Sequence, residues 1–333
     1  MNYVLAIHGG AGTIMPGGDE APYHAALQQA MAAGEAVLAA NGSALDAVSA
    51  AVVELENCIL FNAGRGSVYT SDAVQEMDAI VMDGATQAAG AVAGVCSVQN
   101  PVLLARAVME KSNCVLLMGT GAERFAREQG FAFTPPEYFA SEARLQQLRR
   151  AQEEGKGTLL DHDGAKVVAA AQADGADQAN QSTGSAIKPE PINPDSKFGT
   201  VGAVALDRNG NLASAVSTGG MTNKRPGRVG DTPIVGAGCY ASNASVAVAA
   251  TGTGEHFIRS VLSHDVAARM QYGGATLAEA AHAAVHDKLG AIGGEGGIIA
   301  IGKDGALAMP FNTTGMYRAS VREGEAVVTA IFQ

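Results

Sequence analysis

The stretch from Phe198 to Asp207 contains the residue pair best suited to chemistry, Gly199-Thr200. A long polar segment ends at Phe198, and the apolar run after Thr200, rich in Val and Ala, is typical of a buried strand. A threonine hydroxyl needs a base before it can act as a nucleophile. An α-amino group has a pKa of about 7.7–8.0 and can serve as that base near neutral pH. Cleavage of the Gly199–Thr200 bond would therefore create the nucleophile and base of an amide hydrolase.

The segment before this pair has a composition that suits self-cleavage. The character of the chain changes from roughly 155 to 198, and residues 172–197 contain Gly, Asp, Asn, Gln, Ser and three Pro with almost nothing to bury, which predicts a linker or a disordered segment. Such a segment lets a new chain end leave the site, and Gly199 permits the strained geometry of an N-to-O acyl shift. The simpler alternative is a plain junction between linker and strand, which this pair alone favours.

Two later threonines stand where they can act on Thr200 or its substrate. Thr251 and Gly252 end an apolar run just before a helical stretch, so a hydroxyl or a backbone N–H can face a developing oxyanion there. The alternative is an anion or nucleotide loop, although the chain has neither a full GxGxxG fingerprint nor a Walker sequence. Thr218 ends the strand predicted to pair with the nucleophile strand and can reach Thr200; the alternative is a structural hydroxyl.

A charged loop after these strands carries a candidate substrate clamp. Arg228 and Asp231 are separated by only two residues, and together they can hold the carboxylate and ammonium groups of an amino acid. An exposed salt bridge explains the same pair equally well.

Near the N-terminus, His8 follows the first predicted strand and precedes two glycines. A lone histidine at a strand end is more often a hydrogen-bonded structural residue than a catalytic one.

The stretch from Leu55 to Gly66 is too irregular for a helix and too apolar for a solvated loop. A buried loop of this kind must satisfy its backbone carbonyls. Either a bound monovalent cation or a set of turns and internal hydrogen bonds would do so. The sequence alone favours the turns and internal hydrogen bonds.

The elements around these residues occur as pairs of helices and hairpins of strands. The predicted helices cover 22–41, 43–56, 101–113, 119–129, 141–154 and 275–290, and another follows the 251–255 loop to about 271. Ser43, with Asp46 three residues later, is expected to cap the second of these helices. The predicted strands cover 3–7, 75–82, 88–98, 114–118, 200–206, 212–217, 246–251, 297–301 and 307–311, with two more near the C-terminus. This order predicts an α+β fold of stacked layers with largely antiparallel sheets.

Composition and charge exclude several classes of protein. The chain of 333 residues has a net charge of −11, which argues against nucleic acid or an anionic membrane as partner. Its four cysteines form neither a CxxC pair nor a dense framework, which indicates free thiols in a reducing compartment. No apolar run reaches about 18 residues, and no basic-then-apolar leader precedes the first strand. A soluble, cytoplasmic protein is expected.

Several motifs in a fixed order make the chain similar to a known family. They are HGGAGT from His8, LFNAGRGSV from Leu60, MDG from Met82, GTVGAVALD from Gly199, STGG from Ser217, PGRVGDTPIVGAGCYA from Pro226 and ATGTGE from Ala250. The chain resembles the plant-type asparaginase/isoaspartyl aminopeptidase family of N-terminal-nucleophile hydrolases, which includes the bacterial type III asparaginases. The resemblance spans nearly the whole chain, apart from the segment before Thr200.

This resemblance implies a four-layer αββα sandwich and autocatalytic cleavage before Thr200. It implies an α subunit of residues 1–199 and a β subunit of residues 200–333, which together form one structural domain. The subunits are expected to assemble as an (αβ)2 heterotetramer, from a precursor that is a homodimer.

By position, the resemblance also assigns a role to each candidate residue. Thr200 matches the nucleophile, and Thr218 matches the threonine beside it. Arg228 and Asp231 match the clamp on the α-carboxylate and α-amino groups of the substrate. The other matches are Thr251 and Gly252 at the amide oxygen, Thr253 after them, and Asn62 near the site.

The loop from Leu55 to Arg65 matches the family's sodium loop, which reverses the preference for turns and internal hydrogen bonds. The expected ligands are the backbone carbonyls of Leu55, Glu56, Cys58, Phe61, Ala63 and Arg65. The family often has Ile or a small residue where this chain has Arg65, so the edge of the site is expected to differ while the carbonyl ligand is kept. No cofactor is expected for catalysis.

The implied activity is hydrolysis of isoaspartyl dipeptides and L-asparagine to L-aspartate through a covalent β-aspartyl-Thr200 intermediate. Both substrates present the same β-acyl aspartyl unit, so one clamp serves both. Two alternatives stay open. One is a glycosylasparaginase of the same superfamily, against which the lack of a leader and of a disulfide framework counts. The other is a non-enzymatic phosphate- or nucleotide-binding protein, whose chain would stay intact.

Overall fold

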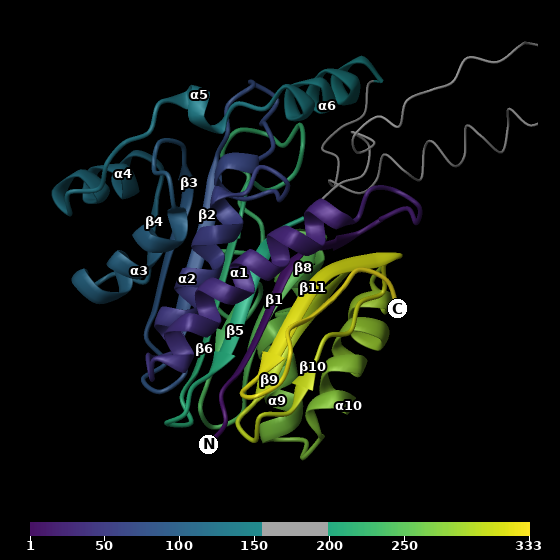
Figure 1. The fold of residues 1–333 in the computed structure, drawn as a ribbon. Helices are drawn as coiled ribbons and strands as arrows, with labels where there is room; N and C mark the ends of the chain where they lie inside the picture. Colours follow the sequence, from purple (N-terminus) through teal and green to yellow (C-terminus); the bar gives the residue numbers. More distant parts are fainter. Residues whose placement is uncertain (155–198) are drawn as a thin grey trace, which may run out of the picture.

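The structure, a computed structural model, describes residues 1–154 and 199–333. It combines helices with strands that form two sheets (Figure 1). Within these ranges, no helix has the length and apolar character needed to cross a membrane. The linker predicted for roughly 155 to 198 lies outside the described residues.

The larger sheet has eight strands and includes strands from both sides of the Gly199–Thr200 bond. All neighbouring strands in it are antiparallel except β3 and β4, which confirms the largely antiparallel sheet expected from the sequence. β1 comes from the N-terminal segment and is hydrogen-bonded between two strands of the C-terminal segment. The order is β12 (Val328–Ala330), β11 (Gly315–Arg322), β1 (Val4–Gly12), β5 (Val201–Leu206), β6 (Leu212–Thr218), β2 (Met77–Asp83), β3 (Ala89–Val95) and β4 (Leu116–Met118).

The smaller sheet has four antiparallel strands in the order β10 (Leu307–Ala308), β9 (Gly296–Gly302), β8 (Val246–Gly252) and β7 (Cys239–Ala241). At the end of β8, Gly252 is paired with Gly296 and has a φ of +151°. A Cβ on Gly252 would collide with the Glu295 carbonyl and the Phe257 ring. Glycine is therefore required where β8 and β9 meet, next to Thr251.

Helices pack against the outer faces of both sheets (Figure 1). Ser43 caps α2 by accepting a 3.1 Å hydrogen bond from the Asp46 N–H, as predicted. The helices in the N-terminal segment are α1 (Ala21–Ala39), α2 (Ala44–Asn57), the short η1 (Gly64–Gly66), α3 (Pro101–Lys111), α4 (Gly119–Glu128), α5 (Pro136–Phe139) and α6 (Glu142–Glu153). Those against the smaller sheet are α8 (Gly254–Ser260), α9 (Leu262–Gln271), α10 (Leu277–His282) and the π-helical η2 (Ala283–Leu289).

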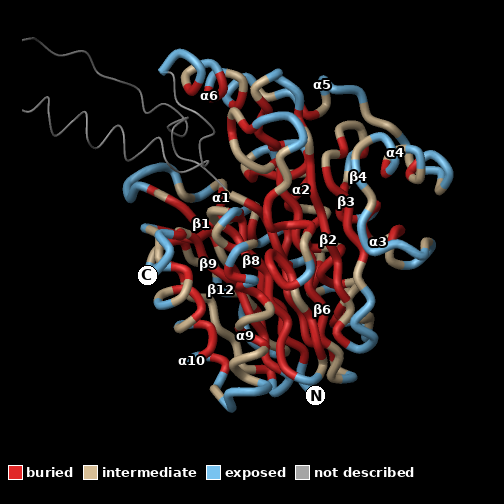
Figure 2. The backbone as a smooth tube through the Cα atoms, turned by 180° about the vertical axis from the view of Figure 1, so that it is seen from behind, coloured by how far each residue is buried: buried red, intermediate tan, exposed pale blue. Residues whose placement is uncertain are grey.

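Three clusters of buried side chains hold these elements together. The first lies between α1–α3 and the larger sheet, the second between the two sheets, and the third between the smaller sheet and its helices. Figure 2 shows buried residues concentrated along the strands. In β5, Ala203 and Ala205 belong to the first cluster, and Val204 and Leu206 belong to the second. Burial of both faces of β5 explains the continuous apolar run after Thr200.

One predicted helix is divided in two. The helix expected to continue to about residue 271 breaks at Val261, which has a left-handed φ of +48° and separates α8 from α9. The N–H groups of Ser263 and His264 donate hydrogen bonds to the carbonyls of Ala237 and Gly236. These contacts with a distant segment occupy the first turn of α9, and apolar periodicity does not reveal them. The helix predicted for 275–290 is continuous, and its hydrogen bonding changes from α-helical in α10 to π-helical in η2.

The first strand is longer than predicted. β1 continues past Ile7 to Gly12, and its pairing with β11 shifts between His8 and Gly10 at a bulge. The glycines after His8 therefore lie within the sheet, where Gly10 has a φ of +111°. β7 and α5 were not predicted, because elements this short depend on tertiary pairing more than on a local pattern.

Candidate active site

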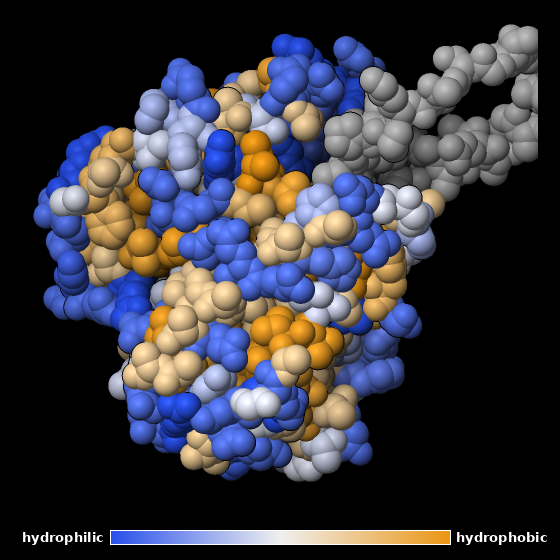
Figure 3. Space-filling view, viewed as in Figure 1, coloured by the Kyte–Doolittle hydropathy of each residue, from blue (hydrophilic) through white to orange (hydrophobic). Residues whose placement is uncertain are grey.

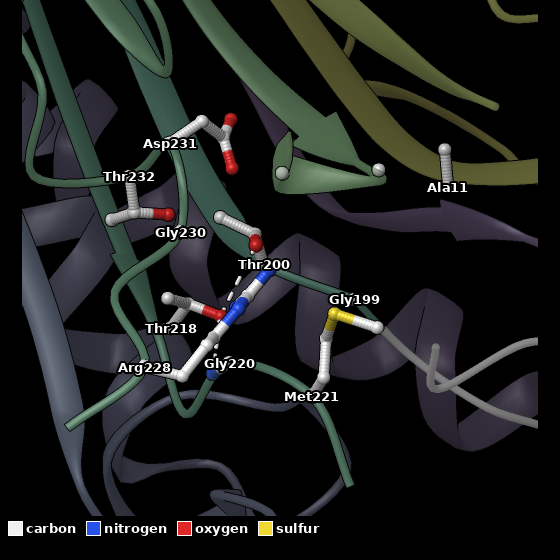
Figure 4. A pocket seen from close by; sticks show the side chains of 12 residues that line it. Ala11, Gly199, Thr200, Thr218, Gly220, Met221, Arg228, Gly230, Asp231 and Thr232 are labelled. Carbon is white, nitrogen blue, oxygen red and sulfur yellow. Dashed lines mark hydrogen bonds between the residues drawn. The ribbon is translucent and has the colours of Figure 1, made fainter. Parts of the chain in front are cut away.

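Thr200 immediately precedes β5 and lies beside the end of β6 (Figure 4). The two strands are antiparallel with Val201 opposite Ser217, which brings Thr200 next to Thr218. The Thr200 hydroxyl donates a 3.1 Å hydrogen bond to the Thr218 hydroxyl. Thr200 is 8% exposed and Thr218 is 3% exposed. The hairpin therefore positions the candidate nucleophile in a nearly enclosed place, beside the hydroxyl expected to reach it.

Backbone and side-chain atoms of other strands closely surround the Gly199–Thr200 bond. A Cβ on Gly199 would lie only 2.9 Å from the Thr251 hydroxyl oxygen. A Cβ on Gly10 of β1 would collide with the Gly199 backbone. β1 and the end of β8 therefore approach the Gly199–Thr200 bond so closely that only glycines fit.

A pocket opens beside the two threonines (Figure 4). It contains the candidate nucleophile, its neighbour Thr218, both members of the candidate clamp, and Gly252. The lining comes from β1, from the ends of β5, β6 and β8, and from the loop after β6. The lining residues are Ala11, Gly199, Thr200, Thr218, Gly220, Met221, Arg228, Gly230, Asp231, Thr232, Gly252 and Gly254.

The two members of the candidate clamp converge on Gly254. A Cβ there would lie 2.9 Å from Asp231 Oδ1 and 3.0 Å from Arg228 Nη2. The Arg228 side chain is 15% exposed, and its Nε and Nη2 each donate a 2.9 Å hydrogen bond to the Glu255 carboxylate. Arg228 is thus ion-paired with Glu255, a partner that the sequence analysis did not identify.

Asp231 is buried beside this ion pair. Burial raises the pKa of the Asp231 carboxyl to about 7, against the opposing effect of the Arg228 charge. Its Oδ2 makes no hydrogen bond to any residue that the structure describes. A buried carboxylate with a free oxygen that lines a pocket is well suited to a ligand ammonium group.

Thr251 and Gly252 lie at the end of β8, on the Gly199 side of the site. The fully buried Thr251 hydroxyl oxygen accepts a 3.3 Å hydrogen bond from the Ala11 N–H. The hydroxyl proton is therefore available to a second partner. The next threonine, Thr253, is the N-cap residue of α8, and its hydroxyl donates to the Glu295 carbonyl at 3.2 Å.

Comparison with known proteins identifies the family. A family profile described as asparaginase matches residues 1–331. The chain belongs to the asparaginase family. It is 52% identical over 334 residues to a protein of Escherichia coli (strain K12) named isoaspartyl peptidase. The aligned region covers 99% of this chain and 96% of that protein. The resemblance inferred from the motifs is therefore confirmed.

Eukaryotic members of the family are also similar along most of their length. A protein of Dictyostelium discoideum named putative isoaspartyl peptidase/L-asparaginase is 47% identical, over 96% of this chain and 93% of that protein. A protein of Rattus norvegicus named isoaspartyl peptidase/L-asparaginase is 39% identical, over 98% of this chain and 88% of that protein.

In this asparaginase-family chain, Asn62 lies behind the pocket rather than in its wall. It is fully buried, and its side-chain Nδ2 donates a 2.7 Å hydrogen bond to the Gly220 carbonyl. Its Oδ1 accepts a 3.0 Å hydrogen bond from the Val68 N–H. The structure therefore places Asn62 in contact with the turn that follows Thr218.

The segment from Leu55 to Arg65 contains the last turn of α2, the loop that follows it and the start of the η1 turn, so its first residues are helical, contrary to expectation. A Cβ on Gly64 would collide with the Glu56 carbonyl, and a Cβ on Gly66 would collide with the Phe61 carbonyl. These two carbonyls therefore face η1 directly. The carbonyls of Leu55, Phe61 and Ala63 accept hydrogen bonds from Cys58, Ala63 and Gly66, respectively. Each carbonyl oxygen has two lone pairs, so these hydrogen bonds leave capacity for another ligand.

His8 is fully buried close to the nucleophile. Its Nε2 contacts Gly202, where a Cβ would collide with it, and neither ring nitrogen has a hydrogen-bond partner within 1–154 and 199–333. Burial lowers the pKa of His8 to about 3, with a smaller opposing effect of the Thr200 backbone. His8 is thus a neutral imidazole whose ring lies against the backbone of Thr200.

Two further charged residues lie behind the pocket and were missed by the sequence analysis. Asp78 and Lys224 are both buried near Arg228. The signal for Asp78 was a carboxylate directly before the apolar run of β2. Lys224 had no local signal, because a lysine in a charged loop normally lies in solvent.

Proposed function

We propose that the chain is an autoprocessing amidohydrolase that hydrolyses isoaspartyl (β-aspartyl) dipeptides and L-asparagine to L-aspartate. The observation that carries the proposal is the Thr200–Thr218 hydrogen bond of 3.1 Å within a pocket that also contains Arg228 and Asp231. This arrangement combines a nucleophile with groups suited to an amino acid. The names of the curated relatives support the same activity and favour neither a glycosylasparaginase nor a phosphate- or nucleotide-binding protein.

In the first step, the Thr200 Oγ attacks the Gly199 carbonyl carbon. The peptide C–N bond breaks as the new ester bond forms, and the proton of the hydroxyl is transferred to the departing nitrogen. Water then hydrolyses the ester, leaving a carboxylate on Gly199 and a free amine on Thr200. The close approach of β1 and β8 to Gly199 supports this step, because it fixes the carbonyl beside its nucleophile.

In the second reaction, the neutral Thr200 amine accepts the proton of its own hydroxyl as Oγ attacks the side-chain carbonyl of the substrate. Ammonia or the peptide amine leaves with that proton. Water then hydrolyses the β-aspartyl ester, which releases L-aspartate and regenerates Thr200. The acyl group is held on one oxygen throughout, so both substrates follow the same path.

The remaining site residues fit the parts of this substrate. Arg228 is proposed to bind the α-carboxylate, and the free oxygen of Asp231 is proposed to bind the α-ammonium group. The Thr251 hydroxyl and the backbone at Gly252 are proposed to stabilise the oxyanion of the tetrahedral intermediate. Asn62 is proposed to act from behind the pocket through the Gly220 carbonyl, which it contacts at 2.7 Å.

We further propose a four-layer αββα sandwich as the architecture of the chain. The three clusters of buried side chains support it, because they separate helices, sheet, sheet and helices in that order.

The residues of the 55–65 loop also fit a sodium ion, since hard cations take carbonyl oxygens and the Glu56 and Phe61 carbonyls face η1. The ion would be bound by the carbonyls of Leu55, Glu56, Cys58, Phe61, Ala63 and Arg65.

Assembly as an (αβ)2 heterotetramer from a homodimeric precursor remains our proposal for the quaternary structure. Edge strand β4 supports an interaction between chains, because Val115, Leu116 and Met118 expose apolar side chains there. Figure 3 shows hydrophobic residues interspersed with hydrophilic ones across one face of the molecule. Light scattering after size exclusion would test the stoichiometry. A cytoplasmic location also stays a prediction.

A direct assay tests the proposed activity. Purified protein is incubated with a β-L-aspartyl dipeptide, with L-asparagine and with a glycosylated asparagine, and free aspartate is measured. We expect aspartate from the first two substrates in the parent and none in Thr200→Ala. Turnover of the glycosylated asparagine alone would favour the glycosylasparaginase alternative.

A further inference from the structure

Lys224 is a fully enclosed charged residue near the pocket. It is 0% exposed, and its Nζ donates a 2.6 Å hydrogen bond to the Glu76 carbonyl. Burial lowers the pKa of Lys224, and the Asp78 carboxyl gives the largest opposing effect. A lysine is almost never fully buried unless its charge is paired.

The side chain of Lys224 lies directly against Gly220. A Cβ on Gly220 would be 2.8 Å from Lys224 Nζ and 3.0 Å from its Cδ. Gly220 has a left-handed φ of +80°, which glycine adopts without strain. The Asn62 side chain donates to its carbonyl at 2.7 Å. Gly220 is thus fixed by Asn62 through its carbonyl and by Lys224 through packing.

Gly220 in turn determines the position of Thr218. The Gly220 N–H donates a 3.0 Å hydrogen bond to the Thr218 hydroxyl oxygen. The same oxygen accepts the 3.1 Å hydrogen bond from Thr200. A shift of the Gly220 N–H would therefore change the acceptor that orients the nucleophile.

Asp78 supplies the negative charge next to Lys224. It lies on β2 opposite Thr218, and its Oδ1 accepts a 2.8 Å hydrogen bond from the Gly94 N–H. Burial raises the pKa of Asp78, whereas the charges of Lys224 and Arg228 oppose that shift. Its Oδ2 has no hydrogen-bond partner in the described part of the chain. The carboxylate therefore compensates the Lys224 charge by proximity.

Lys224 also connects the two halves of the chain. Its backbone carbonyl accepts a 2.8 Å hydrogen bond from Ser71, and Glu76 belongs to the same N-terminal segment. Thr218, Gly220 and Lys224 all belong to the segment that begins at Thr200. After cleavage, Lys224 would still hold the turn of one fragment against the body of the other.

We propose that Lys224, compensated by Asp78, is a positioning residue that holds the Gly220 N–H on the Thr218 hydroxyl and thereby orients the Thr200 nucleophile. The inference rests on the proposed function. It differs from a purely structural role because loss of Lys224 acts on the geometry of the reacting hydroxyl. Substrate binding by Arg228 and Asp231 is affected much less.

The test compares Lys224→Met with Lys288→Met. Both variants lose one ammonium group, but Lys288 is 35% exposed and pairs with Asp265 on the helices of the smaller sheet. The rate of self-cleavage is followed by mass, and kcat and KM are measured per cleaved chain. We expect kcat of Lys224→Met to fall at least about tenfold with KM within about twofold. The Lys288→Met variant is expected to match the parent.

An unchanged kcat, or a raised KM with unchanged kcat, in Lys224→Met would overturn the proposal. If that variant does not fold, Asp78→Asn takes its place, because it keeps the shape and the acceptor for Gly94. We expect Asp78→Asn to show the same loss of kcat. A kcat equal to that of the parent would reject the inference. In the double variant Asp78→Asn/Lys224→Met, the losses are expected to be less than additive.

Hydrogen exchange separates this inference from the proposed function. In uncleaved Thr200→Ala chains, we expect the Gly220 amide to exchange faster when Lys224 is replaced by Met, while amides of β9 keep their protection. An equal Gly220 exchange rate would contradict the inference even if the parent proves inactive. An inactive parent would contradict the proposed function alone.

Discussion

The hydroxyl oxygens of Thr200 and Thr218 lie 3.1 Å apart although 18 positions separate them in the chain. The β5–β6 hairpin creates this contact by placing Val201 opposite Ser217. The same Thr218 oxygen accepts a hydrogen bond from the Gly220 N–H. One hydroxyl therefore links the nucleophile to the loop that carries Arg228 and Asp231.

Replacing Thr218 by Val removes the acceptor for Thr200 and leaves the shape nearly unchanged. We expect kcat to fall about 10- to 100-fold with little change in KM, because the lost interaction concerns the reacting hydroxyl. Steady-state kinetics per cleaved chain measure both parameters. Ser214→Ala is the control on the same strand, since its hydroxyl donates to the Val248 carbonyl away from the pocket. Equal kcat in Thr218→Val and Ser214→Ala would refute this role.

Binding of the α-ammonium group is expected to depend on the ionisation of Asp231. The pKa of this carboxyl is raised to about 7, so it becomes charged as the pH rises through that value. The inhibition constant of L-aspartate should therefore decrease from about pH 6 to about pH 8 in the parent. In Asp231→Asn, inhibition should be weak at both pH values. A parent constant that does not change over this range would contradict the assignment.

The same shift has a consequence for stability. The folded state keeps a proton on Asp231 between about pH 4 and pH 7, whereas the unfolded chain releases it. The unfolding free energy from this group therefore falls as the pH rises through that window. The unfolding free energy of Asp231→Asn should therefore increase relative to that of the parent from pH 4 to pH 7. Urea unfolding of uncleaved chains that carry Thr200→Ala, with and without Asp231→Asn, measures this difference.

His8 has the opposite dependence on pH. Its pKa is lowered to about 3, so the unfolded chain binds a proton below about pH 6.5 that the folded chain does not. The parent should therefore lose stability as the pH falls from about 6.5 towards 3. We expect His8→Gln to remove about 3 kcal/mol of this loss between about pH 7 and pH 4.5. Parallel acid-unfolding curves for parent and variant would show that His8 is not a buried neutral base.

Sodium is expected to stabilise the protein through the 55–65 loop. The melting temperature should rise with sodium chloride but not with tetramethylammonium chloride of equal ionic strength, because only the ion that binds the folded state shifts the equilibrium. Arg65→Ile keeps the backbone carbonyl and should retain the effect. Identical melting curves in the two salts would exclude a sodium site of useful affinity.

The sequence predicted the elements whose pattern is local. The Ser43 cap, the β5–β6 hairpin and the apolar run after Thr200 all have short-range signals, and the structure contains each of them. The break at Val261 has no such signal, because the contacts that divide α8 from α9 come from Gly236 and Ala237. Local periodicity cannot report a contact with a distant loop.

In the candidate site, too, the residues with a local motif were predicted and the contacts between distant segments were not. Motif order indicated Thr200, Thr218, Arg228 and Asp231, and the structure brings all four to one pocket. The charged contacts around the pocket were not predicted. Lys224 reaches Glu76 across 148 positions, and Arg228 reaches Glu255 across 27. Such pairs depend on how the two sheets and their loops pack.

The most direct test of the central claim is the intact mass of the purified chain over time, beside that of Thr200→Ala. We predict that the parent converts to two fragments, residues 1–199 and 200–333, and that Thr200→Ala stays whole. This result would establish Thr200 as a self-cleaving residue with a free amine. Two equal, uncut chains under all conditions would remove that amine and contradict the account.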